Sequence, residues 1–273
     1  RENGVTPIVG LHRIPAKKHP YGALAESMPF LYLSPSTQEA NEYVTGGSEE
    51  YWMNQLADQM VPWLEASGVN VTRNSPAMTA ASSIRASNAG NYDFHLALHS
   101  NAAPPNRYGQ VRGTDVYYYP GSTDGLRMAE IIADNLRQIY PLPQRVRTVA
   151  TTGIGEVRLT RAPSVLLELA YHDNTADANW ITGNLPTIAR SLAESVTEYF
   201  GLPLIAPQTP RPGTVQLGYG SLNLRAAPST GAAIYRQIPN GATVEILGQY
   251  DGWYTVRYGG VIGYARSEFI AAP

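Results

Sequence analysis

A proline-rich stretch divides the chain into two parts with different secondary-structure patterns. Residues 204–213 contain three prolines and lack regular apolar spacing, which is typical of a semi-rigid linker. Before this stretch, strand-like apolar runs alternate with helix-like segments, and after it only short strands and turns follow. We therefore predict an N-terminal segment over 1–29, a large domain over 30–203, the linker over 204–213 and a small domain over 214–273.

The apolar spacing in the large domain predicts an α/β fold. Apolar residues recur on one face of three predicted helices, over 49–67, 124–139 and 176–200. Between them lie predicted strands over 30–33, 69–72, 94–99, 115–119 and 165–170. Strands that alternate with helices predict a three-layer fold, in which a mostly parallel sheet is flanked by helices. In such sheets, sites gather at the carboxyl ends of the strands.

The small domain reads as all-β. Short strands are predicted near 221–225, 233–238, 242–248, 253–257 and 261–265, with turn residues between them. Asp251-Gly252, between alternating apolar residues, is a strong hairpin signal. We expect a small barrel of about 60 residues.

Composition excludes several classes of function. A net charge of −2 argues against a nucleic-acid binder that neutralises phosphates, and the lack of Cys excludes disulfides and thiolate metal sites. No apolar run reaches the roughly 18 residues that a membrane helix needs. Arg1 is not a natural start, so we expect that a signal peptide or anchor preceded it and that the protein is secreted or associated with the cell wall.

Two histidines lie in the strand predicted over 94–99. His99 ends that strand, where an imidazole can ligate a metal in a cleft or can simply cap the turn. His95 lies four residues earlier, about 13 Å away along an extended strand, so one metal cannot bind both. We therefore expect His95 to be a core residue or a residue that supports the site.

Three carboxylates are candidates for chemistry. Glu168 interrupts an apolar strand, so it is either kept for acid–base catalysis or paired with an arginine such as Arg158 or Arg161. Glu49 and Glu50 open the first helix, where the helix dipole favours acidic residues. The alternative is that one of the two is an oxygen ligand of a metal shared with His99.

Taken together, the large domain resembles the type-3 zinc-dependent N-acetylmuramoyl-L-alanine amidases. The resemblance runs from about residue 30 to residue 200. It rests on four stretches that match the family pattern in order and spacing: Glu50-Tyr-Trp-Met-Asn54, Gly68-Val-Asn-Val-Thr-Arg73, Asp93-Phe-His-Leu-Ala-Leu-His99-Ser-Asn101-Ala and Pro163-Ser-Val-Leu-Leu-Glu168-Leu-Ala-Tyr-His-Asp-Asn174.

The small domain resembles a bacterial SH3-like domain. Leu222-Asn-Leu-Arg225-Ala-Ala-Pro228 matches its signature, and Gly252-Trp253-Tyr-Thr-Val256 and Gly263-Tyr264 also fit. Such modules commonly accompany wall hydrolases and bind wall peptides. The resemblance implies that Trp253 and Tyr264 are exposed wall-binding platforms, and the alternative is that both rings belong to the barrel core.

One departure from the amidase pattern concerns the metal. The family's first zinc ligand is a His after the first strand, where this chain has Ser34-Pro-Ser-Thr37-Gln38. Zinc in catalytic sites usually has three protein ligands and a water. We expect Zn²⁺ to be held by Glu50, His99 and a relocated ligand, His172, which the alternative places as a capping residue beside Asp173 and Asn174. A third possibility is weak or absent metal binding.

The resemblance implies a peptidoglycan hydrolase that cleaves the amide between N-acetylmuramic acid and L-alanine with a zinc-activated water. Glu168 would be the general acid–base, Asn101 would position substrate, and Arg158 would pair with a substrate carboxylate or with Glu168. The alternatives are a non-catalytic peptidoglycan-binding protein with an amidase-like fold, and a zinc peptidase of related fold. We expect peptidoglycan as the partner, no nucleic acid, no membrane span and a monomer.

Overall fold

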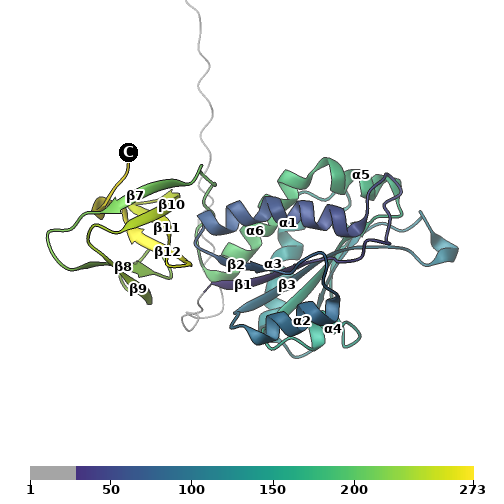
Figure 1. Ribbon diagram of the computed structural model, residues 1–273. Helices are drawn as coiled ribbons and strands as arrows, with labels where there is room; N and C mark the ends of the chain where they lie inside the picture. The colour runs from purple at the N-terminus through teal and green to yellow at the C-terminus, as the bar shows by residue number, and fades with distance from the viewer. Residues whose placement is uncertain (1–28) are drawn as a thin grey trace, which may run out of the picture.

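The structure of the protein is a computed structural model that describes residues 29–273 (Figure 1). Two sheets organise these residues, one with helices on both faces and one that is antiparallel throughout. The predicted α/β domain with a mostly parallel sheet and the predicted small all-β domain are both confirmed. The N-terminal segment predicted over 1–29, with His12 and His19, lies outside the described residues except for its last residue.

The large sheet has the strand order β2-β1-β3-β6-β4-β5. All neighbouring pairs are parallel except β4 and β6, which run antiparallel. Sequence periodicity missed β5, a short strand on the edge of the sheet. The strand bounds are β1 (Phe30–Pro35), β2 (Asn70–Arg73), β3 (Phe94–Asn101), β4 (Thr114–Tyr118), β5 (Val146–Ala150) and β6 (Ser164–Tyr171).

Helices cover the two faces of this sheet unequally. The helices α1, α3 and α6 pack on one face, and the shorter α2 and α4 pack together on the other (Figure 1). The helix bounds are α1 (Glu49–Ala66), α2 (Ala80–Ala89), α3 (Thr123–Arg137), α4 (Gly155–Arg158), α5 (Thr175–Gly183) and α6 (Leu185–Phe200). The 3₁₀ turns are η1 (Pro105–Arg107), η2 (Pro143–Arg145) and η3 (Ser267–Phe269).

The start of α1 shows why this helix forms where it does. Ser48 caps it, since its hydroxyl accepts a hydrogen bond from the Tyr51 N–H, and two acidic residues follow in the first turn. The helix buries Met53, Leu56 and Met60 against the sheet at helical spacing. The helix start therefore determines which acidic residue points toward the sheet.

The prediction of a single helix over 176–200 is wrong. It is divided into α5 and α6 at Asn184, whose backbone leaves the helical region. Pro186 lies in the first turn of α6, where its missing N–H costs nothing, whereas inside a continuous helix that missing donor would break a hydrogen bond.

The small sheet has the strand order β13-β7-β10-β11-β12-β8-β9 and encloses its own apolar core. Its first strand begins at Arg211, inside the predicted linker, and residues 202–210 before it form no helix or strand. The strand bounds are β7 (Arg211–Val215), β8 (Ser221–Arg225), β9 (Ile234–Pro239), β10 (Thr243–Tyr250), β11 (Trp253–Tyr258), β12 (Val261–Arg266) and β13 (Ile270–Ala271).

The small domain packs against the end of α1 and the start of β2 (Figure 1). The Tyr264 hydroxyl donates to the Ser67 carbonyl at 2.5 Å, and the Asn70 side chain forms two hydrogen bonds with the backbone of Ile262. Tyr264 and Trp253 belong to the same apolar cluster as the core of the large domain. The core of the large domain therefore extends to these two rings, beside the small domain's own core.

The prediction that Trp253 and Tyr264 form exposed platforms is wrong. Trp253 is 5% exposed and Tyr264 is fully buried. The physical reason is that the face of the barrel carrying these rings meets the large domain, where the rings fill the space between the two sheets. Their alternative assignment, as core residues, agrees with this packing.

We expect the contact between Gly68 and Tyr264 to be sensitive to a single methyl group. A Cβ at Gly68 would lie 2.4 Å from the Tyr264 ring, whereas a Cβ at Gly46 meets nothing within 4 Å. Both glycines have positive φ, so both Ala substitutions cost about 1–2 kcal/mol of backbone strain. Overpacking adds about 1–3 kcal/mol at Gly68 alone.

The measurement is chemical unfolding of Gly68→Ala and Gly46→Ala side by side. The Gly68 variant should lose more stability than the Gly46 variant. Equal losses would contradict a tight contact between Gly68 and the Tyr264 ring.

Candidate functional site

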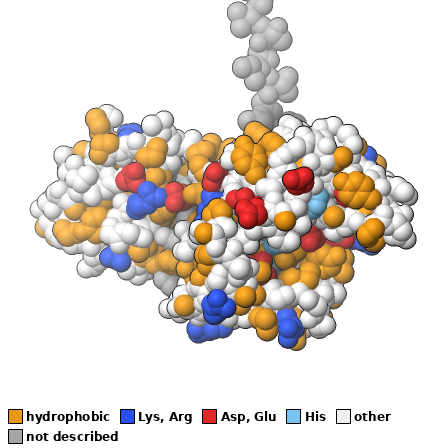
Figure 2. Space-filling model, turned by 45° about the vertical axis from the view of Figure 1, so that its right-hand side comes forward, with side chains coloured by type: hydrophobic (Ala, Val, Ile, Leu, Met, Phe, Trp, Pro, Cys, Tyr) orange, Lys and Arg blue, Asp and Glu red, His pale blue; other side chains and the backbone are white. Residues whose placement is uncertain are grey.

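Polar side chains gather at the carboxyl ends of β1, β3 and β6. His95 and His99 both point to the sheet face that α2 and α4 cover, because alternate residues of a strand share a face. In Figure 2, histidine and acidic side chains reach the surface of the large domain near one another. This is the end of the sheet at which α/β proteins place their sites.

His99 lies between two carboxylates. Its Nδ1 is 2.8 Å from Glu49 Oε1, and its Nε2 is 3.3 Å from Glu156 Oε2. Glu49 opens α1, whereas Glu156 belongs to α4 on the opposite face of the sheet. The imidazole thus joins the two helical layers through its opposite edges.

Glu156 also binds a second histidine. Its Oε1 accepts a hydrogen bond from the Ser34 hydroxyl at 2.5 Å and lies 3.1 Å from His95 Nε2. The other ring nitrogen of His95 forms a hydrogen bond with the Ser87 hydroxyl, and the Tyr32 ring stacks on the imidazole. His95 is therefore the supporting residue that we expected, and the two side chains reach one carboxylate although their Cα atoms are four residues apart.

The contacts among His99, Glu49 and Glu156 determine which of these side chains are charged. Burial opposes the charge of Glu156, but the hydrogen bonds from His95 and His99 outweigh it and lower its pKa to about 2. Burial also opposes the charge of His99, but Glu156 and Glu49 raise its pKa to about 10. Burial raises the pKa of Glu49, yet the hydrogen bond from His99 leaves it lowered overall. Both carboxylates are ionised acceptors, so both ring nitrogens of His99 donate.

Glu168 lies beside this group with an unsatisfied atom. It is in register with His99 on β3 and with Asp115 on β4. Within the part of the chain that the structure describes, its buried Oε2 has no hydrogen-bond partner. Burial raises the pKa of Glu168 to about 7, and Glu49 and Asp115 add to the rise while His99 opposes it. This carboxyl group changes its protonation near neutral pH.

The alternative that pairs Glu168 with an arginine is wrong. Arg161 bonds Asn88 through its backbone and its guanidinium, and Arg158 is exposed on α4. The arginine nearest in register, Arg147, is held by Asp115 instead. The sheet topology accounts for this, because β4 inserts Asp115 and its own partner beside Glu168.

Of the three predicted metal ligands, the structure brings only His99 to this group. Glu49, one residue before the predicted Glu50, contacts His99, and Glu50 is half-buried one position further along the helix. His172 is buried, with its Nδ1 2.9 Å from the Ser100 hydroxyl and its ring stacked on Tyr43. Burial lowers the pKa of His172.

Two further residues noted in the sequence lie at this end of the sheet, Asn101 at the end of β3 and Thr37 just after β1. Asn101 ends β3 partly exposed, and its side chain accepts a hydrogen bond from the Ala102 N–H. Thr37 is half-buried in the loop after β1 and lines a cavity of about 290 Å³ that His99 and Glu156 also line. The cavity therefore borders the His99 group on the side of Thr37.

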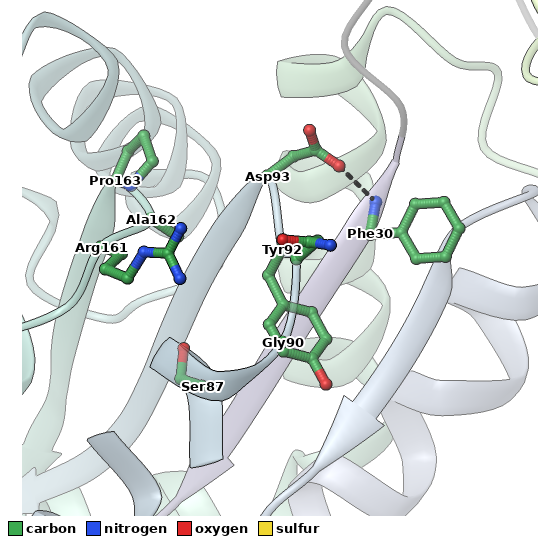
Figure 3. Close-up of a pocket in the computed structure, with 9 residues that line it drawn as sticks. Phe30, Ser87, Gly90, Tyr92, Asp93, Arg161, Ala162 and Pro163 are labelled. Atoms are coloured by element: carbon green, nitrogen blue, oxygen red, sulfur yellow. Dashed lines mark hydrogen bonds between the residues drawn. The ribbon is translucent and has the colours of Figure 1, made fainter. Parts of the chain in front are cut away.

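A larger cavity of about 640 Å³ lies at the other end of the sheet (Figure 3). Phe30, Asp93 and Pro163 line it, and these residues stand at the amino ends of β1, β3 and β6. Asp93 accepts a hydrogen bond from the Phe30 N–H at 3.1 Å. The cavity is thus separate from the His99 group, and no histidine among residues 29–273 lines it.

The described residues do not fit a zinc site with three protein ligands. Among them, no group of three or more His, Cys, Asp or Glu side chains is arranged to hold a metal ion. Glu49 and Glu156 lie at opposite edges of His99, so a metal on either ring nitrogen would meet only one of these carboxylates. Catalytic zinc usually needs three protein ligands.

Sequence reasoning missed Glu156. It lies in a four-residue helix with no apolar periodicity, between two strands of which one was also missed. The signal that was present is a single acidic residue in the otherwise uncharged stretch 148–157. Nothing in the sequence relates that residue to His95 and His99, which precede it by about 60 positions.

We expect Glu156→Ala to destabilise the protein strongly near neutral pH. Removing one partner of a buried charged group leaves the others uncompensated, at a cost of about 3–5 kcal/mol. Glu130→Ala, at an exposed position of α3, is the matched control and should change stability little. Chemical unfolding measures both, and equal stability of the two variants would contradict a cohesive role for Glu156.

The stability that Glu156→Ala removes should depend on pH. Glu156 has a lowered pKa, so its stabilisation is full above its ordinary value of 4.5 and is lost as pH falls through about 2. His99 has a raised pKa, so its stabilisation is full below 6.5 and is lost as pH rises through about 10. The loss caused by Glu156→Ala should therefore be largest between pH 4.5 and 6.5, and a flat profile would contradict these assignments.

Comparison with known proteins agrees with this architecture. The sequence profile of the family described as N-acetylmuramoyl-L-alanine amidase matches residues 37–198, and that of the bacterial SH3 domain matches residues 220–271. No curated protein sequence matches the chain.

Among solved structures, the amidase AmiC2 of Nostoc punctiforme is similar, with a TM-score of 0.56, 17% identity, and coverage of 65% of this chain and 99% of that one. The catalytic domain of the amidase CwlV from Bacillus (Paenibacillus) polymyxa var. colistinus has a TM-score of 0.56, 16% identity, and coverage of 64% and 100%. At these identities the likeness shows the fold. The amidase profile spans more than half of the chain, so the protein belongs to the N-acetylmuramoyl-L-alanine amidase family and carries a bacterial SH3 domain at its C-terminal end.

Proposed function

We propose that the large domain hydrolyses the amide bond between N-acetylmuramic acid and L-alanine in peptidoglycan. Membership of the amidase family supports this reaction class. The observation that carries the proposal is Glu168, whose Oε2 is buried without a partner and whose pKa of about 7 suits a group that must both accept and return a proton.

In this proposal Glu168 acts as general base and then as general acid. It takes a proton from the attacking water while the water oxygen bonds to the amide carbon. When the carbon–nitrogen bond breaks, it returns that proton to the leaving amine of L-alanine. His99 lies one strand away in register, where its positive charge offsets those of the ionised Glu49 and Glu156 beside the site. Asn101, which ends β3, and Arg158, exposed on α4, would contact substrate.

The water activated by zinc, which the resemblance implies, is not part of this mechanism. The ligand set predicted as Glu50, His99 and His172 is not assembled among the described residues, and Thr37 or Gln38 stands where the family has its first histidine. No step is therefore derived through a metal.

The two-domain organisation supports a site of action at the cell wall. The bacterial SH3 domain commonly accompanies wall hydrolases, so peptidoglycan is the proposed partner of both domains. Among the described residues, no helix has the length and apolar character to cross a membrane. We propose that the protein acts as a monomeric, secreted or wall-associated autolysin.

A second candidate function is non-catalytic binding of peptidoglycan by the amidase fold. The observation that favours it is His99, whose two ring nitrogens are both bonded to carboxylates and are thus not free for a metal. Under this alternative, substrate enters the cavity beside Thr37 but no bond is cleaved.

Digestion of purified peptidoglycan distinguishes the two functions. Wild type, Glu168→Gln and the exposed control Glu130→Ala are incubated with walls, with and without chelator, and mass spectrometry identifies the products. Amidase activity predicts stem peptides with a free L-alanine amine from wild type and control, and a rate about 10²–10⁴-fold lower for Glu168→Gln. Sedimentation with walls without any product would replace hydrolysis by binding.

The pH dependence of the hydrolysis should report Glu168. Its raised pKa means that the carboxylate forms only as pH rises through about 7, so the rate should fall below that pH. A rate that stays constant from pH 5 to pH 8 would exclude Glu168 as the base.

The contribution of Glu168 to the free energy of unfolding should fall as pH rises, whereas the hydrolysis rate should increase. A group with a raised pKa stabilises the fold at low pH and loses that contribution as pH rises through about 7. Glu168→Gln is therefore expected to increase the free energy of unfolding above pH 7, by at most about 3 kcal/mol, and to have little effect near pH 4. Thermal unfolding at the two pH values measures this, and a variant that is less stable at both would contradict the buried charge.

A further inference from the structure

The loop after β1 lacks the histidine that the amidase family uses there as a zinc ligand. Thr37 stands after β1, half-buried, on the wall of the cavity that also touches His99 and Glu156. A threonine hydroxyl is not among the zinc ligands that proteins use, which are thiolates, imidazoles and carboxylates. Among residues 29–273, this side of His99 therefore supplies no further metal donor.

The second observation is that Glu156 is anchored from three sides. Ser34 on β1, His95 on β3 and His99 at the end of β3 all contact its two oxygens. Ser34, His95 and Glu156 are all less than 5% exposed. If Glu156 moved aside to free His99 Nε2, two buried polar groups would lose their partner, at a cost of about 1–3 kcal/mol each.

The third observation concerns the other edge of the ring. Glu49 holds His99 Nδ1, and its second oxygen accepts a hydrogen bond from the Asn41 side chain at 2.7 Å. The ring is thus bound at both nitrogens by groups that are themselves held in place. Each edge offers one nitrogen and one carboxylate, which is one ligand short of a catalytic zinc site.

From these contacts we infer that the His99 site is metal-free in the functional protein, and that Glu156 is the positioning residue that holds His99 and His95 in place of a metal. The inference goes beyond the proposed hydrolysis, because it concerns what occupies the site and not which bond is cut. It makes Glu156 the centre of a hydrogen-bonded unit that links β1, β3 and α4.

Zinc binding tests the first half of the inference. Wild type and His99→Ala, both without an affinity tag, are dialysed against micromolar zinc and their zinc content is measured by mass spectrometry. We expect the same zinc content in both, because any zinc that persists without His99 lies elsewhere on the chain. One additional zinc per chain in wild type would overturn the inference.

The imidazole NMR signals test the second half. In ¹⁵N-labelled protein, Glu156→Gln should shift the ring signals of His95 and His99 together, because one carboxylate contacts both rings. The signals of His172, which is bonded to Ser100, should stay in place and serve as the internal reference. If the His99 signals do not move, Glu156 does not hold that ring and the inference is wrong.

The outcome is separate from that of the wall digestion. If Glu156→Gln does not fold, Ser34→Ala removes one donor to the same carboxylate and should still move the His95 signals. Zinc content and ring signals are read without substrate. A metal-free protein that releases no stem peptide would uphold this inference and refute the proposed hydrolysis, whereas a zinc-loaded protein that releases them would do the reverse.

Discussion

A buried charge must be paired, and in this protein one imidazole is paired with carboxylates from both sides of the sheet. Glu49 reaches His99 from the first turn of α1, and Glu156 reaches it from α4 on the other face. Any shift of either helix relative to β3 would leave a charge unpaired in the interior, which is costly. The arrangement of both helical layers at the carboxyl end of the sheet therefore depends on this pairing.

A second constraint joins the two domains. The rings of Trp253 and Tyr264 are buried within the same apolar cluster as α1, and Asn70 pairs with the backbone of β12. The surface of the small domain that carries these rings is thus used to fix its position. The proposed recognition of the wall by this domain would therefore use other faces of the barrel.

Sequence reasoning succeeded where patterns are local and failed where they are not. The strand that carries His99 and the strand that contains Glu168 were both predicted, because an apolar run with few polar residues is visible in the sequence. The sequence did not predict which of Glu49 and Glu50 contacts His99. Adjacent helical residues point about 100° apart, and the cap at Ser48 decides which one faces the sheet. Glu156 could not be found, because its partners lie about 60 positions away.

The sequence by itself determined the class of fold, the division into an α/β part and a β part, and the family. These follow from period, turn chemistry and motif order, all of which are local. Only the tertiary structure decided which carboxylates hold His99, that Glu168 has no arginine, and that the aromatic residues of the barrel are buried. Those outcomes depend on which strands and helices become neighbours, and a pairing between distant elements is set by the packing of the whole chain.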